Sequence, residues 1–242
     1  MTISTQPPEL VAPLRFYRSA PRPCAYLPDR NEQLIFAELD DDNAVESYDT
    51  LTHAGFRRSH NIIYRPACAN CVACVPVRIV AHDFKPDRSL RRVRRRNDDV
   101  TVSLRPPRAT AEQFRVFSQY QRSRHNGGDM ADMTFPQYRA MIEETSVDTF
   151  IAEARCPAGG LVGVVFGDRL GDGISAVYSF FDPQVSDRSP GTFMILWLID
   201  EAVRINLPYV YLGYWIEESP KMAYKSRFRP IEALGSKGWQ TL

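Results

Sequence analysis

Apolar side chains are spaced most regularly in the second half of the chain. After Thr110 they recur at helical intervals at Phe114, Phe117 and Tyr120, which predicts a helix capped by that threonine. Thr134, with a proline two positions later, opens a second helix. The sequence therefore predicts two consecutive helices at the start of this half.

The period then changes to short apolar runs separated by turns that contain glycine. This pattern predicts an antiparallel meander with strands at residues 150–154, 161–166 and 174–181. Residues 192–206 follow as a helix that is apolar nearly all round, so we expect it to be largely buried. The remaining predictions are a strand at 209–212, a helix at about 219–226 and a strand near 231–234.

The first half of the chain has shorter apolar segments. Residues 45–54 have helical composition, and Ser89 can start a helix that carries the arginines up to Arg96. Short strands are expected at 61–64, 75–80 and 100–104. Two prolines then break the chain, so we place a domain boundary between residues 105 and 106. The predicted organisation is a flexible lead-in at 1–14, an N-terminal domain at 15–105 and a second domain at 106–242.

These elements predict an α+β fold, with a smaller α/β domain that bears the cysteines at the N-terminus. The order in the second half is similar to the GNAT acyltransferase fold, which combines an antiparallel or mixed sheet with helices. GNAT proteins hold an acyl donor at two splayed central strands and its pyrophosphate at the start of the next helix. Arg188 and Gly191 match their loop pattern, whereas Phe193 replaces a small residue and argues against acyl-CoA.

Composition adds limits on the class of protein. The chain has 242 residues with a net charge of +1 and 44% hydrophobic residues, which is typical of a globular protein. The longest apolar run, residues 193–199, is far below the roughly 20 residues that cross a bilayer. There is no pattern of a secretory signal at residues 1–13, and the five cysteines are an odd number. We therefore expect a cytoplasmic monomer without membrane contact.

Charge is unevenly distributed along the first half. Residues 29–49 hold eight acids and one base, a local net of −7, whereas residues 85–96 hold seven bases and one acid, a local net of +6. Such a basic patch can bind a polyanion despite the low net charge. At helical spacing Arg91 and Arg95 share one face, and Arg92 and Arg96 share another. The alternative is a solvated helix face that partly neutralises the acidic segment.

Short motifs occur in a characteristic order along the chain. They are residues 23–29 (PCAYLPD), 55–59 (GFRRS), 64–74 (YRPACANCVAC), the Arg-rich stretch to Asn97, 124–130 (RHNGGDM), 207–216 (LPYVYLGYWI) and 220–225 (PKMAYK). Over about residues 15–239 this set resembles the bacterial aspartate/glutamate leucyltransferases, which are relatives of the arginyl-tRNA–protein transferases. The resemblance implies transfer of leucine from leucyl-tRNA to the α-amino group of proteins with N-terminal Asp or Glu, which creates an N-degron.

That reaction makes modest demands on the protein. An aminoacyl-tRNA ester is already activated, and an α-amine has a pKa of about 7.7–8.0, so neither a covalent nucleophile nor a cofactor is required. An oxyanion donor and a proton path complete the site. The predicted catalytic residues follow the strand at 209–212 and are Tyr214, Lys221, Tyr224 and Lys225. The alternative places the aromatic residues in the core and the lysines in solvent; His125 and Asp129 are expected to form a structural pair.

Arginines are the candidates for both substrates. Contact with tRNA is predicted for Arg91, Arg92, Arg95, Arg96, Arg188 and Gly191. The acidic N-terminal residue of the acceptor protein needs a cation, and a guanidinium fits a carboxylate better than an ammonium does. Candidates for that contact are Arg57, Arg58 and Arg65, with the Arg-rich stretch as a competitor.

Three cysteines have the spacing Cys68-x-x-Cys71-x-x-Cys74, and Cys24 is a candidate fourth ligand. The run is similar to part of a ferredoxin pattern, which makes an Fe–S cluster one candidate, and tetrahedral zinc is a further possibility. The alternative is a set of reduced thiols that shape the acceptor site. Other functions left open are an acyl-CoA-dependent GNAT enzyme, transfer of arginine instead of leucine, and a non-catalytic RNA-binding module.

Overall fold

The computed structural model describes residues 14–39, 43–124, 128 and 130–242. The helices are α1 (Ala44–His53), α2 (Arg88–Arg96), α3 (Ala111–Arg124), α4 (Phe135–Glu143) and α5 (Pro190–Arg204), with 3-10 helices η1 (Pro183–Arg188) and η2 (Ala223–Arg227). The strands are β1 (Tyr17–Arg18), β2 (Arg22–Pro23), β3 (Asn31–Glu32), β4 (Leu34–Glu38), β5 (Arg57–Ser59), β6 (Ile62–Pro66), β7 (Val75–Val80), β8 (Thr101–Arg105), β9 (Thr149–Arg155), β10 (Leu161–Arg169), β11 (Gly173–Phe181), β12 (Tyr209–Trp215), β13 (Ile231–Gly235) and β14 (Gly238–Thr241).

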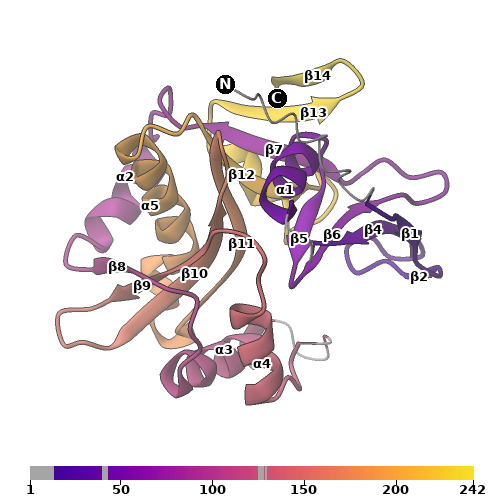
Figure 1. The fold of residues 1–242 in the computed structure, drawn as a ribbon. Coiled ribbons are helices and arrows are strands. Elements are labelled where there is room, and N and C mark those ends of the chain that lie inside the picture. Colours follow the sequence, from indigo (N-terminus) through magenta and orange to yellow (C-terminus); the bar gives the residue numbers. More distant parts are fainter. Residues whose placement is uncertain (1–13, 40–42, 125–127, 129) are drawn as a thin grey trace, which may run out of the picture.

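One large sheet organises the molecule, with the strand order β14-β13-β7-β12-β11-β10-β9-β8. Strands β9, β10 and β11 pair antiparallel, which confirms the predicted meander. β11 then pairs parallel with β12. Figure 1 shows α2 and α5 lying together beside this sheet, α3 and α4 at its lower end, and a smaller sheet to one side. The smaller sheet has the order β1-β4-β6-β5.

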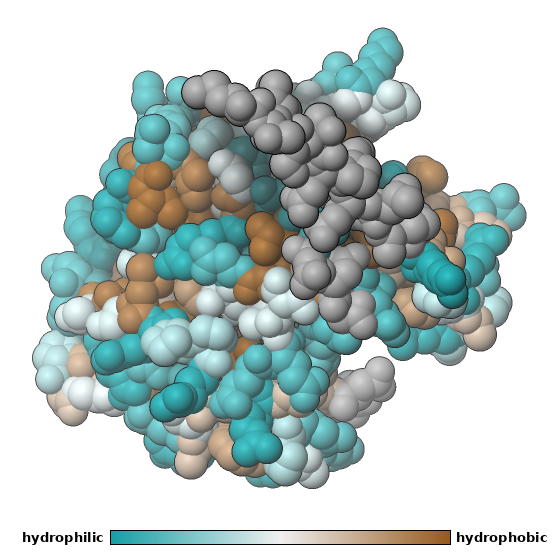
Figure 2. Space-filling model, in the orientation of Figure 1, coloured by the Kyte–Doolittle hydropathy of each residue, from teal (hydrophilic) through white to brown (hydrophobic). Residues whose placement is uncertain are grey.

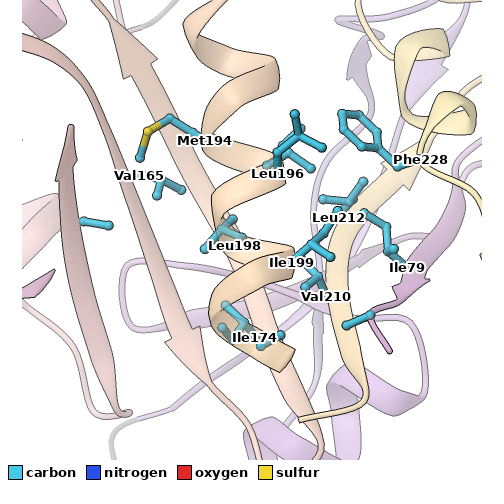
Figure 3. Close-up of a cluster of buried hydrophobic side chains, with 14 of the residues drawn as sticks. Ile79, Val165, Ile174, Met194, Leu196, Leu198, Ile199, Val210, Leu212 and Phe228 are labelled. Atoms are coloured by element: carbon cyan, nitrogen blue, oxygen red, sulfur yellow. The ribbon is translucent and has the colours of Figure 1, made fainter. Parts of the chain in front are cut away.

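The main core lies between the large sheet and α5. Leu196 and Leu198 of α5 are fully buried, and they pack with strand residues such as Ile79 and Val210. Figure 3 shows this cluster, with the side chains of α5 directed at the strands. The helix is apolar on nearly all sides because the sheet and α2 both contact it, which confirms the predicted burial of this segment.

Strands from before residue 106 take part in the large sheet. β7, which is almost entirely buried, lies between β13 and β12, and β8 pairs with β9 at the edge. The run of Val and Ile in β7 suits a central strand that is covered on both faces. The sheet therefore contains strands from both sides of the expected boundary between residues 105 and 106.

Several local predictions need correction. The N-cap of α2 is Asp87 and not Ser89: the carboxylate of Asp87 accepts a hydrogen bond from the N–H of Leu90 at 2.7 Å, and the Ser89 hydroxyl donates to the same carboxylate. The expected helix at 219–226 is a short 3-10 helix, η2. The two- and three-residue strands of the first half and β14 were not predicted, because such short segments show no period.

The surface is consistent with the composition. Figure 2 shows a mostly hydrophilic face with small, separated apolar areas. In the described part of the chain, every helix is too short or too polar to cross a bilayer. The expectation for the lead-in at 1–14 falls almost entirely on residues outside the described part.

Candidate active site

The two parallel strands at the centre of the large sheet separate along their length. β11 and β12 pair only from Gly173 and Tyr209 to Ser175 and Tyr211, although both strands continue for several residues. Beyond that point each strand has main-chain groups that do not bond to the other strand. The separation creates a gap in the sheet between the C-terminal parts of β11 and β12.

The side chain of Arg57 on β5 bridges this gap. Its guanidinium donates to the carbonyl oxygens of Ala176 at 3.0 Å and Val177 at 3.1 Å on β11, and to that of Leu212 at 3.5 Å on β12. Gly213 has a φ of 72°, and a Cβ at that position would collide with the guanidinium of Arg57. Only glycine therefore permits this close approach.

A cavity of about 720 Å³, here called the large cavity, opens at the gap between the sheet, α3 and α5. Its basic side chains are Arg57, Arg124, Lys221 and Lys225, and its described lining contains no Asp or Glu. The other lining residues are Ala25, Tyr26, Tyr120, Gln121, Gly128, Met130, Val165, Ala176, Val177, Tyr178, Ser179, Met194, Ile195, Leu198, Leu212, Met222 and Tyr224. The large cavity is thus cationic in part and apolar in part.

Lys225 is a buried amine at the wall of this cavity. Its side chain is almost fully enclosed, and Nζ donates to the carbonyl oxygen of Tyr214 at 2.5 Å. Burial lowers the pKa of Lys225 well below its ordinary value, and the positive charge of Arg57 lowers it further. The neutral form of this amine, which is both a donor and a proton acceptor, is therefore more favoured than in an exposed lysine.

The other predicted catalytic residues take different positions. Lys221 and Tyr224 are exposed residues that line the large cavity. The Tyr214 hydroxyl instead points away from it and contacts the carbonyl oxygens of Gly55 at 3.0 Å and Tyr64 at 3.1 Å. Burial raises the pKa of Tyr214, so the phenol stays protonated. Tyr214 is not among the described residues that line the large cavity, and its carbonyl oxygen binds Lys225, which does line it.

The three arginines predicted to bind the acceptor differ in burial, in hydrogen-bond partners and in position relative to the large cavity. Arg58 lies in a buried cluster, where two of its nitrogens donate to the Asp168 carboxylate at 2.7 Å each. The hydroxyls of Tyr48 and Thr149 donate to the same carboxylate. Arg65 is exposed and donates to the carbonyl oxygen of Ala54. Of the three, only Arg57 lines the large cavity.

The residues predicted to bind tRNA lie on or near α2. Arg91, Arg92, Arg95 and Arg96 lie on α2, at or near the surface. The end of α2 adjoins the start of α5, because the side chain of Asn97 donates to the carbonyl oxygen of Arg188 at 2.9 Å. Arg188 itself forms a two-pronged ion pair with Asp99, at 2.7 and 3.1 Å. Gly191 lies in the first turn of α5 and faces the ring of Phe181.

The predicted cysteine cluster lines a second cavity of about 280 Å³, here called the cysteine cavity. Cys24, Cys68, Cys71 and Cys74 all contribute to its wall, and all four are free thiols. A hydrogen bond from the N–H of Ala73, followed by one from Arg30, lowers the pKa of Cys71. Burial raises the pKa of Cys74 to about 12, and the neighbouring cysteines add to that effect.

This arrangement does not fit a metal site as it stands. In the described ranges, no three His, Cys, Asp or Glu side chains are placed so that together they could hold a metal ion. The Fe–S cluster or zinc ion at these thiols stays a prediction.

Some lining residues were missed by the sequence analysis. Tyr120 and Gln121 were assigned only to a helix face, yet both line the large cavity, and Gln121 donates to the hydroxyl of Tyr178 at 2.6 Å. Tyr26 lines both cavities. Its place in the PCAYLPD motif was the available signal. The expected pair of His125 and Asp129 lies outside the described residues.

Comparisons with known proteins agree with this architecture. The family model for the N terminus of arginine-tRNA-protein transferase matches residues 22–92, and that for the C terminus matches residues 112–235. The aspartate/glutamate leucyltransferase of Paramagnetospirillum magneticum is 54% identical over 96% of this chain and 95% of its own length. That of Rhodospirillum rubrum is 51% identical over 93% and 92%.

Among solved structures, L-PGS from Bacillus licheniformis is 12% identical, with a TM-score of 0.49 over 84% of this chain and 69% of that one. That likeness is too distant to bear on the site. The two matched family regions lie on either side of residues 93–111 and together span most of the chain. At this level of identity and coverage, the chain belongs to the arginine-tRNA-protein transferase family.

Proposed function

We propose that the protein transfers leucine from leucyl-tRNA to the α-amino group of proteins that begin with Asp or Glu, and so creates an N-degron. The observation that carries the proposal is the lining of the large cavity, which combines four basic side chains with apolar residues and has no described acid. A carboxylate and an aliphatic side chain are both accommodated by such a lining. The 54% and 51% identical relatives are named aspartate/glutamate leucyltransferase, which agrees with transfer of leucine to Asp or Glu.

The reaction exchanges one acyl bond for another. The lone pair of the neutral α-amine attacks the carbonyl carbon of the leucyl ester, and an N–C bond forms as the C–O bond to the tRNA ribose breaks. One proton leaves the amine and one is gained by the ribose oxygen, so atoms and charge balance. Because the ester is already activated, orientation of the two substrates supplies much of the acceleration.

Lys225 is suited to handle the proton. The lowered pKa makes its neutral form available, and Nζ is fixed by its hydrogen bond to the carbonyl oxygen of Tyr214. We assign it the role of accepting the proton from the attacking amine. Tyr224 and Lys221 line the same cavity, and we assign them the roles of donors to the ester carbonyl oxygen and to the leaving ribose oxygen.

Arg57 is our candidate for reading the acidic residue of the acceptor. It is buried against three main-chain carbonyls, and no ion pair joins it to any described Asp or Glu. A carboxylate that enters the cavity would supply the missing anion. Arg58 already has Asp168, and Arg65 lies outside the cavity, so both are weaker candidates.

We assign the binding of the donor, leucyl-tRNA, to the side of the molecule that carries α2 and the start of α5. The arginines of α2 offer phosphate contacts, and Asn97 holds the end of α2 against the segment that leads into α5. The diverging parallel strands β11 and β12, which α5 connects, support a GNAT-like domain in the second half of the chain. The reaction requires no cofactor, and we place a monomeric enzyme in the cytoplasm, where leucyl-tRNA is made.

The proposal is tested with the full chain, labelled leucyl-tRNA and four peptides that differ only in an N-terminal Asp, Glu, Asn or Gln. Label should appear on the Asp and Glu peptides. An amide leaves the buried guanidinium without an anion, at a cost of about 2–5 kcal/mol, so transfer to Asn and Gln peptides should be slower by about 30-fold or more. Acetyl-CoA serves as the alternative donor. Transfer from acetyl-CoA but not from leucyl-tRNA would refute the proposal.

A further inference from the structure

Part of the large cavity is lined by a group of apolar side chains, here called the apolar wall. Its members are Val165, Met194, Ile195, Leu198 and Leu212. Each side chain is at most 8% exposed, and all five belong to the main core cluster. A surface built from core residues is held rigidly, because each side chain is also packed from behind.

The apolar wall is assembled from three elements that meet at the gap in the sheet. Met194, Ile195 and Leu198 lie on α5, while Val165 and Leu212 come from β10 and β12. Figure 3 shows Met194 directed at Val165, with Leu198 one turn further along the helix. Leu212 is also the residue whose carbonyl oxygen accepts from Arg57. The apolar and cationic parts of the cavity therefore meet at the diverging strands, where the acyl group would lie.

The separate apolar and cationic parts of the cavity favour some side chains of the transferred amino acid over others. An isobutyl group that enters the apolar wall leaves water and gains close packing. A guanidinium in the same place would be buried without any described carboxylate, in a cavity that already holds four basic side chains. The apolar wall is therefore suited to leucine and unsuited to arginine, which is the amino acid named in the family description.

We infer that the apolar wall binds the side chain of the transferred amino acid and selects leucine over arginine and over larger apolar residues. The inference rests on the proposed function and extends it from the reaction to the residues that choose the donor. The cationic part of the cavity is left to the acceptor and to the tRNA end. One cavity thus holds two side chains of opposite character, each on its own wall.

The test uses one tRNA body so that tRNA recognition stays constant. tRNALeu is charged chemically with leucine, phenylalanine or arginine, and the three forms compete for an Asp peptide. In the unmodified enzyme, leucine should be transferred at least about 30-fold faster than arginine. Product ratios within one reaction do not depend on how much of the enzyme is folded.

Two alanine variants on the same helix separate a binding role from a packing role. Leu198→Ala enlarges the apolar wall, whereas Leu196→Ala removes an equally buried leucine of the same core cluster that does not line the cavity. Leu198→Ala should lower the preference for leucine over phenylalanine by about tenfold or more, since one methylene in an apolar pocket is worth about 10–200-fold. Leu196→Ala should leave that ratio unchanged. Met194→Ala provides a second enlarged wall should Leu198→Ala fail to fold.

The outcomes distinguish failure of the proposed function from failure of the inference. If no form of tRNALeu donates its amino acid to the peptide, the proposed function itself fails. If leucine is transferred but Leu198→Ala and Met194→Ala keep the ratios of the unmodified enzyme, the inference about the apolar wall is overturned. Equal transfer of arginine and leucine by the unmodified enzyme would also overturn it.

Discussion

The arginines of β5 and those of α2 carry the same charge in contrasting environments. On β5, Arg57 and Arg58 are adjacent and therefore point to opposite sides of the strand; Arg57 is half-buried at the large cavity, whereas Arg58 is buried. One contacts only neutral carbonyls, and the other contacts a carboxylate. On α2, the four predicted arginines lie at or near the surface.

The contrast shows that a guanidinium acquires its role from its partners. Arg58 stabilises the fold, because Asp168 satisfies its charge within the protein. Arg57 still lacks an anion among the described residues and faces the large cavity, so its charge is available to a substrate. The arginines of α2 are reached by water, so each contributes little by itself, and they act together on a polyanion.

The largest expected effect comes from breaking the ion pair of Arg58. Asp168→Asn leaves a buried guanidinium without its anion and should reduce the free energy of unfolding by about 3–5 kcal/mol, as measured by urea denaturation. The matched control is Asp200→Asn, which breaks the exposed pair with Arg94 and should cost at most about 1 kcal/mol. Similar losses for both variants would contradict the assignment of Arg58 to the fold.

The next largest effect concerns acceptor choice. Arg57→Met should lower kcat/KM for a peptide that begins with Asp by a factor that corresponds to about 2–5 kcal/mol of activation free energy. It should also bring the rates for Asp and Asn peptides close together. The Asp/Asn ratio is the measurement, because it does not change with the amount of folded protein. Arg65→Met is the control and should preserve the ratio. If only Arg65→Met lost the preference for Asp over Asn peptides, the acceptor contact would lie at the exposed Arg65 and not in the large cavity.

A third prediction uses the other enclosed cation, Lys225. Because its pKa is lower in the folded chain than in the unfolded one, the unfolded state binds more protons between those two values, and stability rises with pH across that window. The slope is at most about 1.4 kcal/mol per pH unit. Lys225→Met should remove this slope in urea titrations below about pH 10, and the variant should gain stability relative to the parent as pH falls. An unchanged slope would show that Lys225 remains charged.

The smallest effect is expected on α2. Replacing Arg91, Arg92, Arg95 and Arg96 with alanine should change stability by at most about 0.5 kcal/mol per substitution, because the side chains lie at the surface. The plot of log affinity for tRNA against log salt concentration should become less steep. Its slope should change by about 0.7–0.9 for each phosphate that is no longer neutralised. Between about 50 and 200 mM salt, that amounts to about threefold in affinity per phosphate. An unaltered slope in the folded variant would exclude α2 from the tRNA interface.

The sequence predicted most of the longer elements of both halves, including α1, β6, β7, α2 and β8 of the first, and missed β4 and the shortest strands. The meander and α5 were predicted because each is long enough to repeat its pattern several times. The strands β1, β2 and β3 have two residues each, so they show no pattern to detect. The place of β7 in the large sheet was also inaccessible, because its partners lie far along the chain and strand pairing leaves no local signal.

For the site, the sequence identified the region but not the orientation of its side chains. Arg57 and Lys225 were predicted and do line the large cavity. Tyr214 was predicted with them, yet its hydroxyl is bound to the carbonyl oxygens of Gly55 and Tyr64, away from the cavity. The pairing of β12 with β7 shifts between Tyr211 and Gly213, and such an irregularity changes which face the following side chains take. Gly213, an isolated glycine within this strand, was the available signal of that shift.

The central position of β7 has a consequence for how the chain folds during its synthesis. β7 leaves the ribosome about 130 residues before β12, and β13 follows later still. At about 5–20 residues per second, its two edges wait for roughly 6–26 s before either partner exists. An apolar strand with open edges invites wrong pairing during that time. The growing chain is thus most exposed to aggregation between the synthesis of β7 and that of β12. The sheet closes only when nearly all of the protein has been made.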